Sequence, residues 1–179
     1  PSQFLNIYTN DASGFLGYAY LPDGSAGQIF DGVVMLSDSI GGRDNGFGQY
    51  DQGRTLVHEV GHYLGLNHTF QGEAACSNTF SSGDLVVDTN AESGPYYGSA
   101  SSCDSRSTCG SVDPVDNYMD YNTDSCMSRF TAQQVNRMIC STINYRAGLI
   151  TVDTDNEEEN SDLCIPIKAG NGNISVICI

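Results

Sequence analysis

All three histidines of the chain lie in a single eleven-residue stretch, HEVGHYLGLNH, which begins at His58. His58 and His62 are four residues apart, so an α-helix places both imidazoles on one face, where they can bind the same cation. Glu59 lies about 100° further round the helix and can face the open side of that cation without binding it. Gly65 predicts the end of the helix, in a left-handed conformation that costs glycine little, and the chain can then return His68 to the cation. Three neutral imidazoles and one water are the ligands of a catalytic zinc site.

The chemistry of such a site is the hydrolysis of a peptide bond. Zinc lowers the pKa of its bound water to roughly 7. Glu59 would take a proton from this water during the attack on the carbonyl, and would then deliver the proton to the leaving amine. Two other interpretations are a structural zinc site and histidines exposed on a surface helix. A structural site has no use for Glu59 and is normally closed by a fourth protein ligand, so we favour the catalytic site.

The element that must carry these residues is a helix in GRTLVHEVGHYLG, which starts at Gly53. Its apolar residues recur at helical spacing, at Leu56, Val57, Val60 and Leu64. Apolar and β-branched runs before it, separated by Gly-rich loops, predict three strands at residues 3–9, 16–22 and 31–36.

A second helix is predicted from residue 131 to about residue 146. Thr131 and Gln134 have the spacing of a capping box. One apolar face of this helix is expected in the core, formed by Val135, Met138, Ile139 and Ile143. Residues 69–130 show little periodicity and are read as ordered loops. The predicted fold class is α+β.

The composition limits the function classes. The net charge of −15 comes from 22 acidic and 7 basic residues, so binding to nucleic acid or to an anionic membrane is not expected. The sequence holds no apolar run long enough to span a membrane. Seven cysteines in 179 residues predict an oxidising, extracellular compartment. The alternatives are buried thiols in a cytosolic protein or a cysteine zinc site, although no CxxC pair is present.

The chain resembles a metzincin metallopeptidase, since DNYMDY supplies Met119 for the methionine turn that follows the third histidine in that group. More narrowly, it is similar to the pappalysin family of secreted peptidases. The motifs that carry this resemblance are HEVGHYLGLNHTFQG, GDLVVDT, DNYMDY and DSCMSRFTAQQVNRM, between residue 53 and about residue 140. The resemblance implies a short twisted sheet and the zinc helix above the cleft. Below the cleft it implies a loop-rich, disulfide-bonded half with a C-terminal helix.

The resemblance also implies roles for single residues. The zinc ligands would be His58, His62 and His68, with Glu59 as the general base. Met119 would form the hydrophobic floor under the metal. Tyr121 would point its hydroxyl group towards the zinc and help to hold the reaction intermediate; from the residues alone it could be an ordinary half-buried tyrosine.

GDLVVDT resembles the calcium loop of the family. Asp84 would give its carboxylate, Val87 its backbone carbonyl and Thr89 a further oxygen, and such oxygen ligands suit calcium. Without the resemblance, the segment would be interpreted as a turn followed by a short strand.

The cysteines of the loops match those of the family. Sequence alone allows three pairings of four cysteines, whereas the family pattern implies two crossed bridges, Cys76 to Cys109 and Cys103 to Cys126. Cys164 and Cys178 could join a hairpin formed around a GNGN turn. Cys140 is expected to be buried and free, or bonded to a missing partner.

The resulting hypothesis is a secreted zinc endopeptidase that acts on protein or peptide substrates. Residues 1–150 would form its catalytic domain, with an upper part at 1–68 and a lower part at 69–150. The family has further strands and a long helix upstream, so an exposed sheet edge or apolar face is expected. Residues 151–179 are read as an acidic linker and the start of a tail or module.

Substrate would add to the edge strand at 16–22 as an extra antiparallel strand, and acidic residues such as Asp124 could line the pocket downstream of the cut. The alternatives are another metzincin, a zinc amidase, or an inactive fragment that binds peptides or calcium.

Overall fold

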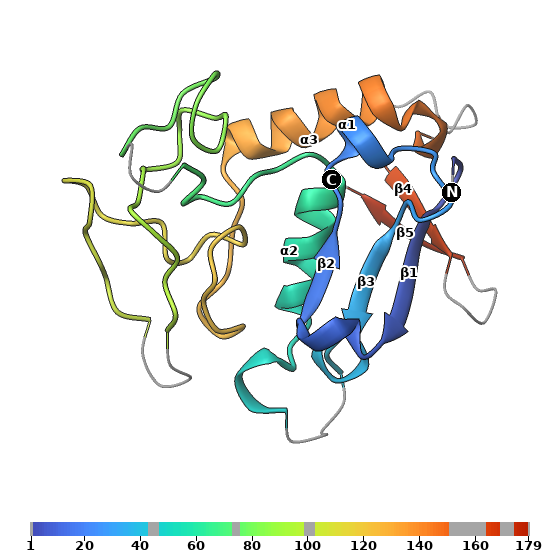
Figure 1. The fold of residues 1–179 in the computed structure, drawn as a ribbon, viewed down its shortest axis with the longest axis horizontal. Coiled ribbons are helices and arrows are strands. Elements are labelled where there is room, and N and C mark those ends of the chain that lie inside the picture. Colours follow the sequence, from blue (N-terminus) through green and yellow to red (C-terminus); the bar gives the residue numbers. More distant parts are fainter. Residues whose placement is uncertain are drawn as a thin grey trace.

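The fold is α+β, as the sequence predicts, with a small twisted sheet, two main helices and a loop-rich half. The computed structural model describes residues 2–42, 47–72, 76–98 and 103–150, together with the backbone of 164–168 and 174–178. Figure 1 shows α2 between the sheet and the loop-rich half, and α3 across one end of the molecule. The helix that carries His58 and His62 therefore has the sheet on one side and the loops on the other.

The sheet has the strand order β2-β3-β1-β4-β5. Its first three strands confirm the sequence prediction: β1 (Leu5–Asn10) is shifted towards the C-terminus of the predicted range, and β2 (Gly17–Ala19) and β3 (Val33–Leu36) are shorter than predicted. β1 pairs with β3 in parallel, with Ile7 opposite Val33. β2 pairs with β3 antiparallel and lies at the edge of the sheet.

Short helical turns connect these strands and the main helices. They are α1 (Pro22–Ser25), η1 (Ala12–Gly14), η2 (Ser37–Ser39), η3 (Gly48–Tyr50) and η5 (Ala147–Leu149). Pro22 occupies the first position of α1, where proline is tolerated because its missing N–H would have no partner there.

Both ends of helix α2 (Arg54–Tyr63) are determined by residues outside the helix. At its start, the Asp124 carboxylate accepts hydrogen bonds from the backbone N–H groups of Gln52 at 2.7 Å and Arg54 at 3.2 Å. At its end, Gly65 has φ +100°, and a side chain there would meet Ser141. The role predicted for Gly65 is confirmed. The Asp124 side chain is buried and stabilises the start of α2, a role that the sequence did not predict, and its contribution to a substrate pocket stays a prediction.

Helix α3 (Ala132–Tyr145) starts with the predicted capping box between Thr131 and Gln134. Its packing agrees with the prediction at Met138, which lies in the core, and at Val135, which packs against the core, but it differs at two other positions. Cys140 is exposed, not buried, and carries a free thiol. Ile143 is 54% exposed, so it does not belong to the core. The buried residues within the helix are Gln134, Met138 and Thr142.

The two C-terminal strands form a hairpin, β4 (Cys164–Lys168) and β5 (Ile174–Cys178). β4 also pairs in parallel with β1, so these strands continue the same sheet. Cys164 and Cys178 are opposite each other in the register. Their side chains lie outside the described residues, as does the acidic segment 151–163, so the bridge between them stays a prediction.

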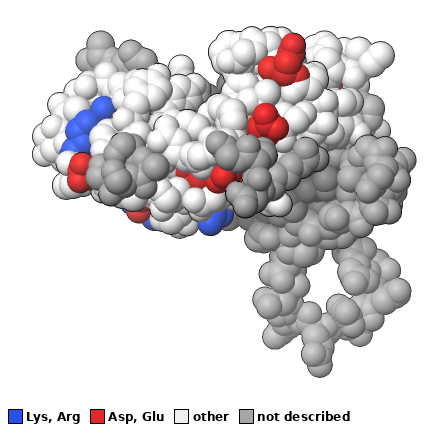
Figure 2. Space-filling view, turned by 90° about the horizontal axis from the view of Figure 1, so that it is seen from below, with Lys and Arg blue, Asp and Glu red and all other residues white. Residues whose placement is uncertain are grey.

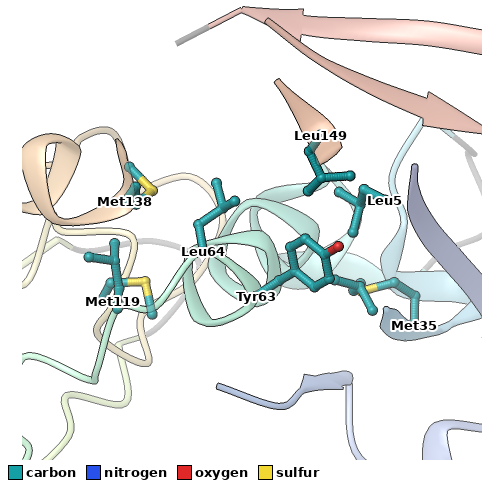
Figure 3. Close-up of a cluster of buried hydrophobic side chains, with 9 residues drawn as sticks. Leu5, Met35, Tyr63, Leu64, Met119, Met138 and Leu149 are labelled. Carbon is teal, nitrogen blue, oxygen red and sulfur yellow. The ribbon is translucent and has the colours of Figure 1, made fainter. Parts of the chain in front are cut away.

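One hydrophobic cluster connects the sheet, α2, the methionine turn and α3. Its members are Leu5, Val33, Met35, Tyr63, Leu64, Leu66, Met119, Met138 and Leu149. In Figure 3, Tyr63 of α2 lies towards Leu5 and Met35 of the sheet, whereas Met119 and Met138 lie beyond Leu64. The position of α2 is therefore fixed on both sides by the same core.

The face of the sheet away from α2 is partly open, as expected from the resemblance. Tyr20 and Phe30 are about half exposed there. They line a groove of about 900 Å³ together with Tyr8 and Tyr18. Charged side chains are scattered over the described surface that Figure 2 shows, and at its left edge a basic and an acidic side chain lie next to each other. No helix in the described part of the chain has the length and apolar character needed to cross a membrane.

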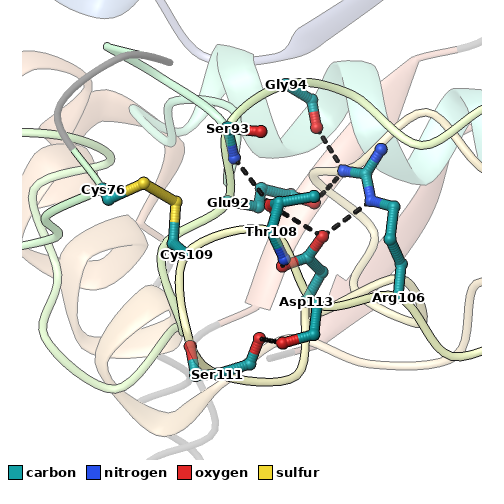
Figure 4. The surroundings of a disulfide bond; sticks show 10 residues. Cys76, Glu92, Ser93, Gly94, Arg106, Thr108, Cys109, Ser111 and Asp113 are labelled. Atoms are coloured by element: carbon teal, nitrogen blue, oxygen red, sulfur yellow. Dashed lines mark hydrogen bonds and ion pairs between the residues drawn. A yellow bond between two sulfur atoms is a disulfide. The ribbon is translucent and has the colours of Figure 1, made fainter.

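The loop-rich half is held by two disulfides and a buried ion-pair network. Cys76 is bonded to Cys109, and Cys103 to Cys126, which are the pairs implied by the family resemblance. Beside the first bridge, Arg106 donates to Asp113 at 2.6 Å and to Glu92 at 2.9 Å (Figure 4). These contacts replace regular secondary structure, which the described residues between 69 and 130 lack apart from isolated bridges.

Candidate metal centre

The three histidines converge on one point. The Nε2 atoms of His58 and His62 are 3.1 Å apart, those of His62 and His68 are 3.0 Å apart, and those of His58 and His68 are 3.2 Å apart. α2 supplies the first two, and the turn after Gly65 returns the third. Among the described residues, no other group of three His, Cys, Asp or Glu side chains brings its ligand atoms so close together.

Hydrogen bonds to backbone carbonyls determine which ring nitrogen faces this point. The Nδ1 atom of His58 lies 2.6 Å from the carbonyl oxygen of Tyr118, and that of His62 lies 2.8 Å from the carbonyl oxygen of Leu66. A carbonyl only accepts, so both Nδ1 atoms carry the proton. A neutral imidazole has one N–H, which leaves the two Nε2 lone pairs facing each other.

Burial also keeps these histidines neutral. It lowers the pKa of all three, and the neighbouring imidazoles lower the pKa of His58 and His68 further. The pKa of His68 falls to about 3. Three neutral imidazoles with converging lone pairs repel one another unless a cation lies between them.

The donor set fits zinc. Nitrogen ligands about 2.0–2.1 Å from a tetrahedral zinc are roughly 3.3 Å from each other, close to the observed separations of 3.0–3.2 Å. Three histidines also leave a fourth position open, as in catalytic zinc sites. His58, His62 and His68 are therefore the residues that could hold the metal.

Glu59 lies beside this cluster, under the edge strand. Its side chain is buried, and burial raises its pKa to about 8, against the opposing effect of a hydrogen bond from the Ala19 backbone N–H. A side chain at Gly17 would lie 2.9 Å from Cγ of Glu59 and 2.8 Å from Sδ of Met35. Glycine at this position lets β2 approach the carboxylate closely.

The methionine turn lies below the histidines. Met119 is fully buried, and a side chain at Gly61 of α2 would lie 2.5 Å from its Sδ atom. Tyr121 is half-exposed beside the histidines, with its ring centroid 4.8 Å from that of His68 and 5.6 Å from that of His58. Burial and the charge of Glu59 raise the pKa of the Tyr121 hydroxyl.

The loop GDLVVDT brings together two of the three oxygen ligands expected for calcium. The Thr89 hydroxyl donates to the Asp84 carboxylate, and burial raises the pKa of Asp84 to about 6. Val87 is exposed and donates its N–H to the Gln133 side chain at 2.8 Å. The segment forms no regular strand, so the alternative interpretation of a turn followed by a strand is only half right.

Sequence reasoning missed three kinds of contact around the histidines. Tyr118 and Leu66 contribute backbone carbonyls, which no side-chain type can reveal. Phe70 stacks on His68 with ring centroids 4.6 Å apart, and its place two residues after the last histidine was the only available signal. Arg137 of α3 donates to the Gly65 carbonyl at 2.8 Å, which holds the turn that returns His68.

Comparison with known proteins adds a family match. The peptidase family described as pregnancy-associated plasma protein-A matches residues 1–142. The chain is 46% identical over 151 residues to an extracellular metalloprotease of Colletotrichum graminicola, covering 80% of this chain and 51% of that protein. It is 45% identical over 151 residues to extracellular metalloprotease 1 of Coccidioides posadasii, with the same coverage. The chain thus spans about half the length of these relatives.

Solved structures agree with this match. Mature mirolysin of Tannerella forsythia in complex with a cleaved peptide is similar to the chain with a TM-score of 0.60 and 34% identity, over 76% of this chain and 51% of that one. A mutant of promirolysin from the same organism gives a TM-score of 0.64 and 32% identity, over 82% of this chain and 49% of that one.

Proposed function

The chain belongs to the pappalysin family of peptidases, described as pregnancy-associated plasma protein-A, and we propose that it is the catalytic part of a secreted zinc endopeptidase. The observation that carries this proposal is the convergence of three Nε2 atoms beside a buried carboxylate under an edge strand. The relatives' description as extracellular supports secretion, as do two disulfides in the loop-rich half.

Zinc held by His58, His62 and His68 would supply a Lewis acid and an acidified water. Glu59 is placed to accept a proton at its carboxylate and to return it to the leaving amine. Its pKa is raised by burial, and a nearby cation would lower it towards neutral pH, where a general base is most effective. Tyr121 would donate a hydrogen bond from its hydroxyl group to the developing oxyanion, and Met119 would support the histidines from below.

The edge strand β2 would bind the substrate. No described strand pairs with its outer side, because β3 occupies only one side, although the Ala19 N–H donates to Glu59. An extended peptide can therefore add antiparallel to β2 through main-chain hydrogen bonds. Gly17 and Ala19 lie directly over Glu59, so this alignment would place a peptide carbonyl beside the catalytic groups.

We further propose that calcium binds the loop at Asp84, Val87 and Thr89 and stabilises it. A buried carboxylate with a raised pKa gains most from a nearby cation. The proposed division of the chain is a catalytic domain at 1–150 and a tail at 151–179.

The test is the cleavage of casein by the wild type, with and without a zinc chelator, beside Glu59→Gln. The glutamine keeps the size of the side chain and the zinc ligands but removes the base, so we expect a loss of at least about 100-fold in rate with one zinc still bound. Asp23→Asn, an equal change of charge at an exposed site on α1, is the matched control and should cut normally. A folded, zinc-loaded wild type that does not cut would favour the inactive peptide- or calcium-binding fragment.

A further inference from the structure

A pair of buried amides connects the methionine turn with α3. The Nδ2 atom of Asn117 donates to Oε1 of Gln134 at 2.8 Å, and Nε2 of Gln134 donates back to Oδ1 of Asn117 at 3.0 Å. Both side chains are almost completely buried. Gln134 was predicted from the sequence only as the last member of a capping box, and this second contact goes beyond that role.

The same amides hold the backbone of the turn on one side and the start of α3 on the other. Oδ1 of Asn117 also accepts the backbone N–H of Met119 at 2.9 Å. Oε1 of Gln134 also accepts the backbone N–H of Thr131 at 2.8 Å. The acceptors are therefore fully used, and removal of either side chain leaves buried polar groups of the other without a partner.

Tyr118 lies between the two turn residues that this pair fixes. Its carbonyl oxygen is the partner of His58 Nδ1 at 2.6 Å. That contact keeps the proton on Nδ1 and leaves Nε2 of His58 free. A shift of the methionine turn would weaken this contact. The imidazole of His58 could then rotate and change its tautomer.

The start of α3, which carries Gln134, is held independently of the methionine turn. The Thr131 hydroxyl donates to Asp88 at 2.7 Å, and the Gln133 backbone N–H donates to the same carboxylate at 2.9 Å. The first helical turn of α3 is thus bonded to Asp88, in the loop that precedes the methionine turn in the chain. The position of Gln134 therefore does not depend on its own contact with Asn117.

We propose that Asn117 and Gln134 are positioning residues that hold the Tyr118 carbonyl against His58 and so set the affinity of the histidines for zinc. The proposal rests on the zinc site of the proposed function. Residues that orient a metal ligand from behind typically change metal affinity by about 10–100-fold when they are removed.

The experiment compares the zinc dissociation constants of the wild type, Gln134→Met and Thr142→Ala, by competition with a chromophoric chelator. Gln134→Met keeps the length of the side chain and removes its hydrogen bonds, and we expect zinc binding to weaken about 10–100-fold. Thr142→Ala removes another buried hydrogen-bonding group of α3, whose hydroxyl, among the described residues, bonds within the helix to the Met138 carbonyl. It should lower stability while leaving zinc affinity within about 3-fold, well below the range expected for a positioning residue.

If Gln134→Met folds poorly, the variant Gln134→Glu and the absorption spectrum of bound cobalt still test the proposal. Gln134→Glu retains the acceptor for Thr131 and Asn117 but places a carboxylate oxygen against the Oδ1 atom of Asn117, so a loss of affinity is expected here too. Cobalt in place of zinc should give d–d absorption bands that shift in both Gln134 variants and not in Thr142→Ala. Wild-type affinity and an unchanged cobalt spectrum in the folded variants would overturn the proposal, as would an equal loss in Thr142→Ala. A wild type that binds no zinc would instead refute the proposed zinc site.

Discussion

Gly61→Ala tests the contact between α2 and the methionine turn. Alanine in a helix interior is more favourable than glycine by about 1 kcal/mol. At this site, however, the added methyl group would lie 2.5 Å from Sδ and 3.3 Å from Cε of Met119, and 3.5 Å from Cδ1 of Leu66. Met119 is fully buried and cannot move into solvent. Overpacking of a buried site costs about 1–3 kcal/mol, so we expect a net loss of about 0–2 kcal/mol in the free energy of unfolding.

The double-mutant cycle with Met119→Ala isolates that contact. Met119→Ala alone should cost about 2–5 kcal/mol because it leaves a cavity. Within the Met119→Ala background the clash is gone, and Gly61→Ala should now stabilise the protein by about 1 kcal/mol. The free energies come from urea unfolding with the disulfides intact and a metal chelator present. If Gly61→Ala changed stability equally in both backgrounds, within about 0.5 kcal/mol, the inferred contact between the helix and the turn would be refuted.

Two further predictions concern buried charges. Arg146 donates to Asp31 and to the Tyr63 carbonyl at 2.5 Å each, so Arg146→Met should cost about 3–5 kcal/mol in urea unfolding, and a loss below about 1 kcal/mol would contradict the role of the ion pair. Burial, with repulsion from Asp120, raises the pKa of Glu92 from 4.5 to about 7. The folded state then holds this proton more tightly, so the contribution of Glu92 to stability is present below pH 4.5 and is lost as the pH rises to about 7. Glu92→Gln should flatten that fall in urea titrations across this range, and an unchanged slope would count against the raised pKa.

Local features of the chain could be predicted well from sequence. The histidine spacing, Gly65 and the Thr131–Gln134 capping box each depend on a few neighbouring residues, and all three appear in the structure. Asp124 could not be assigned in this way, because its partners at the start of α2 are about 70 positions away in sequence.

The packing of α3 shows a second limit. The buried residues of α3 are Gln134, Met138 and Thr142, which are four residues apart, and two of them are polar. Gln134 is satisfied by Asn117, and the Thr142 hydroxyl donates to the Met138 carbonyl. An assignment based on apolar residue types therefore found Met138 and Val135, which pack in or against the core, but it also included the exposed Ile143 and missed the two buried polar residues.

The bridge between Cys103 and Cys126 encloses the methionine turn within a closed loop. A bridge over a loop of 23 residues removes chain entropy from the unfolded state worth about 3 kcal/mol. Oxidation of the thiols and metal uptake both favour the folded chain, so each promotes the other by mass action. This linkage implies an order of maturation. If the chain is secreted and binds zinc as proposed, the thiols would oxidise outside a reducing compartment, and the bridged chain would then bind the metal more tightly than the reduced one.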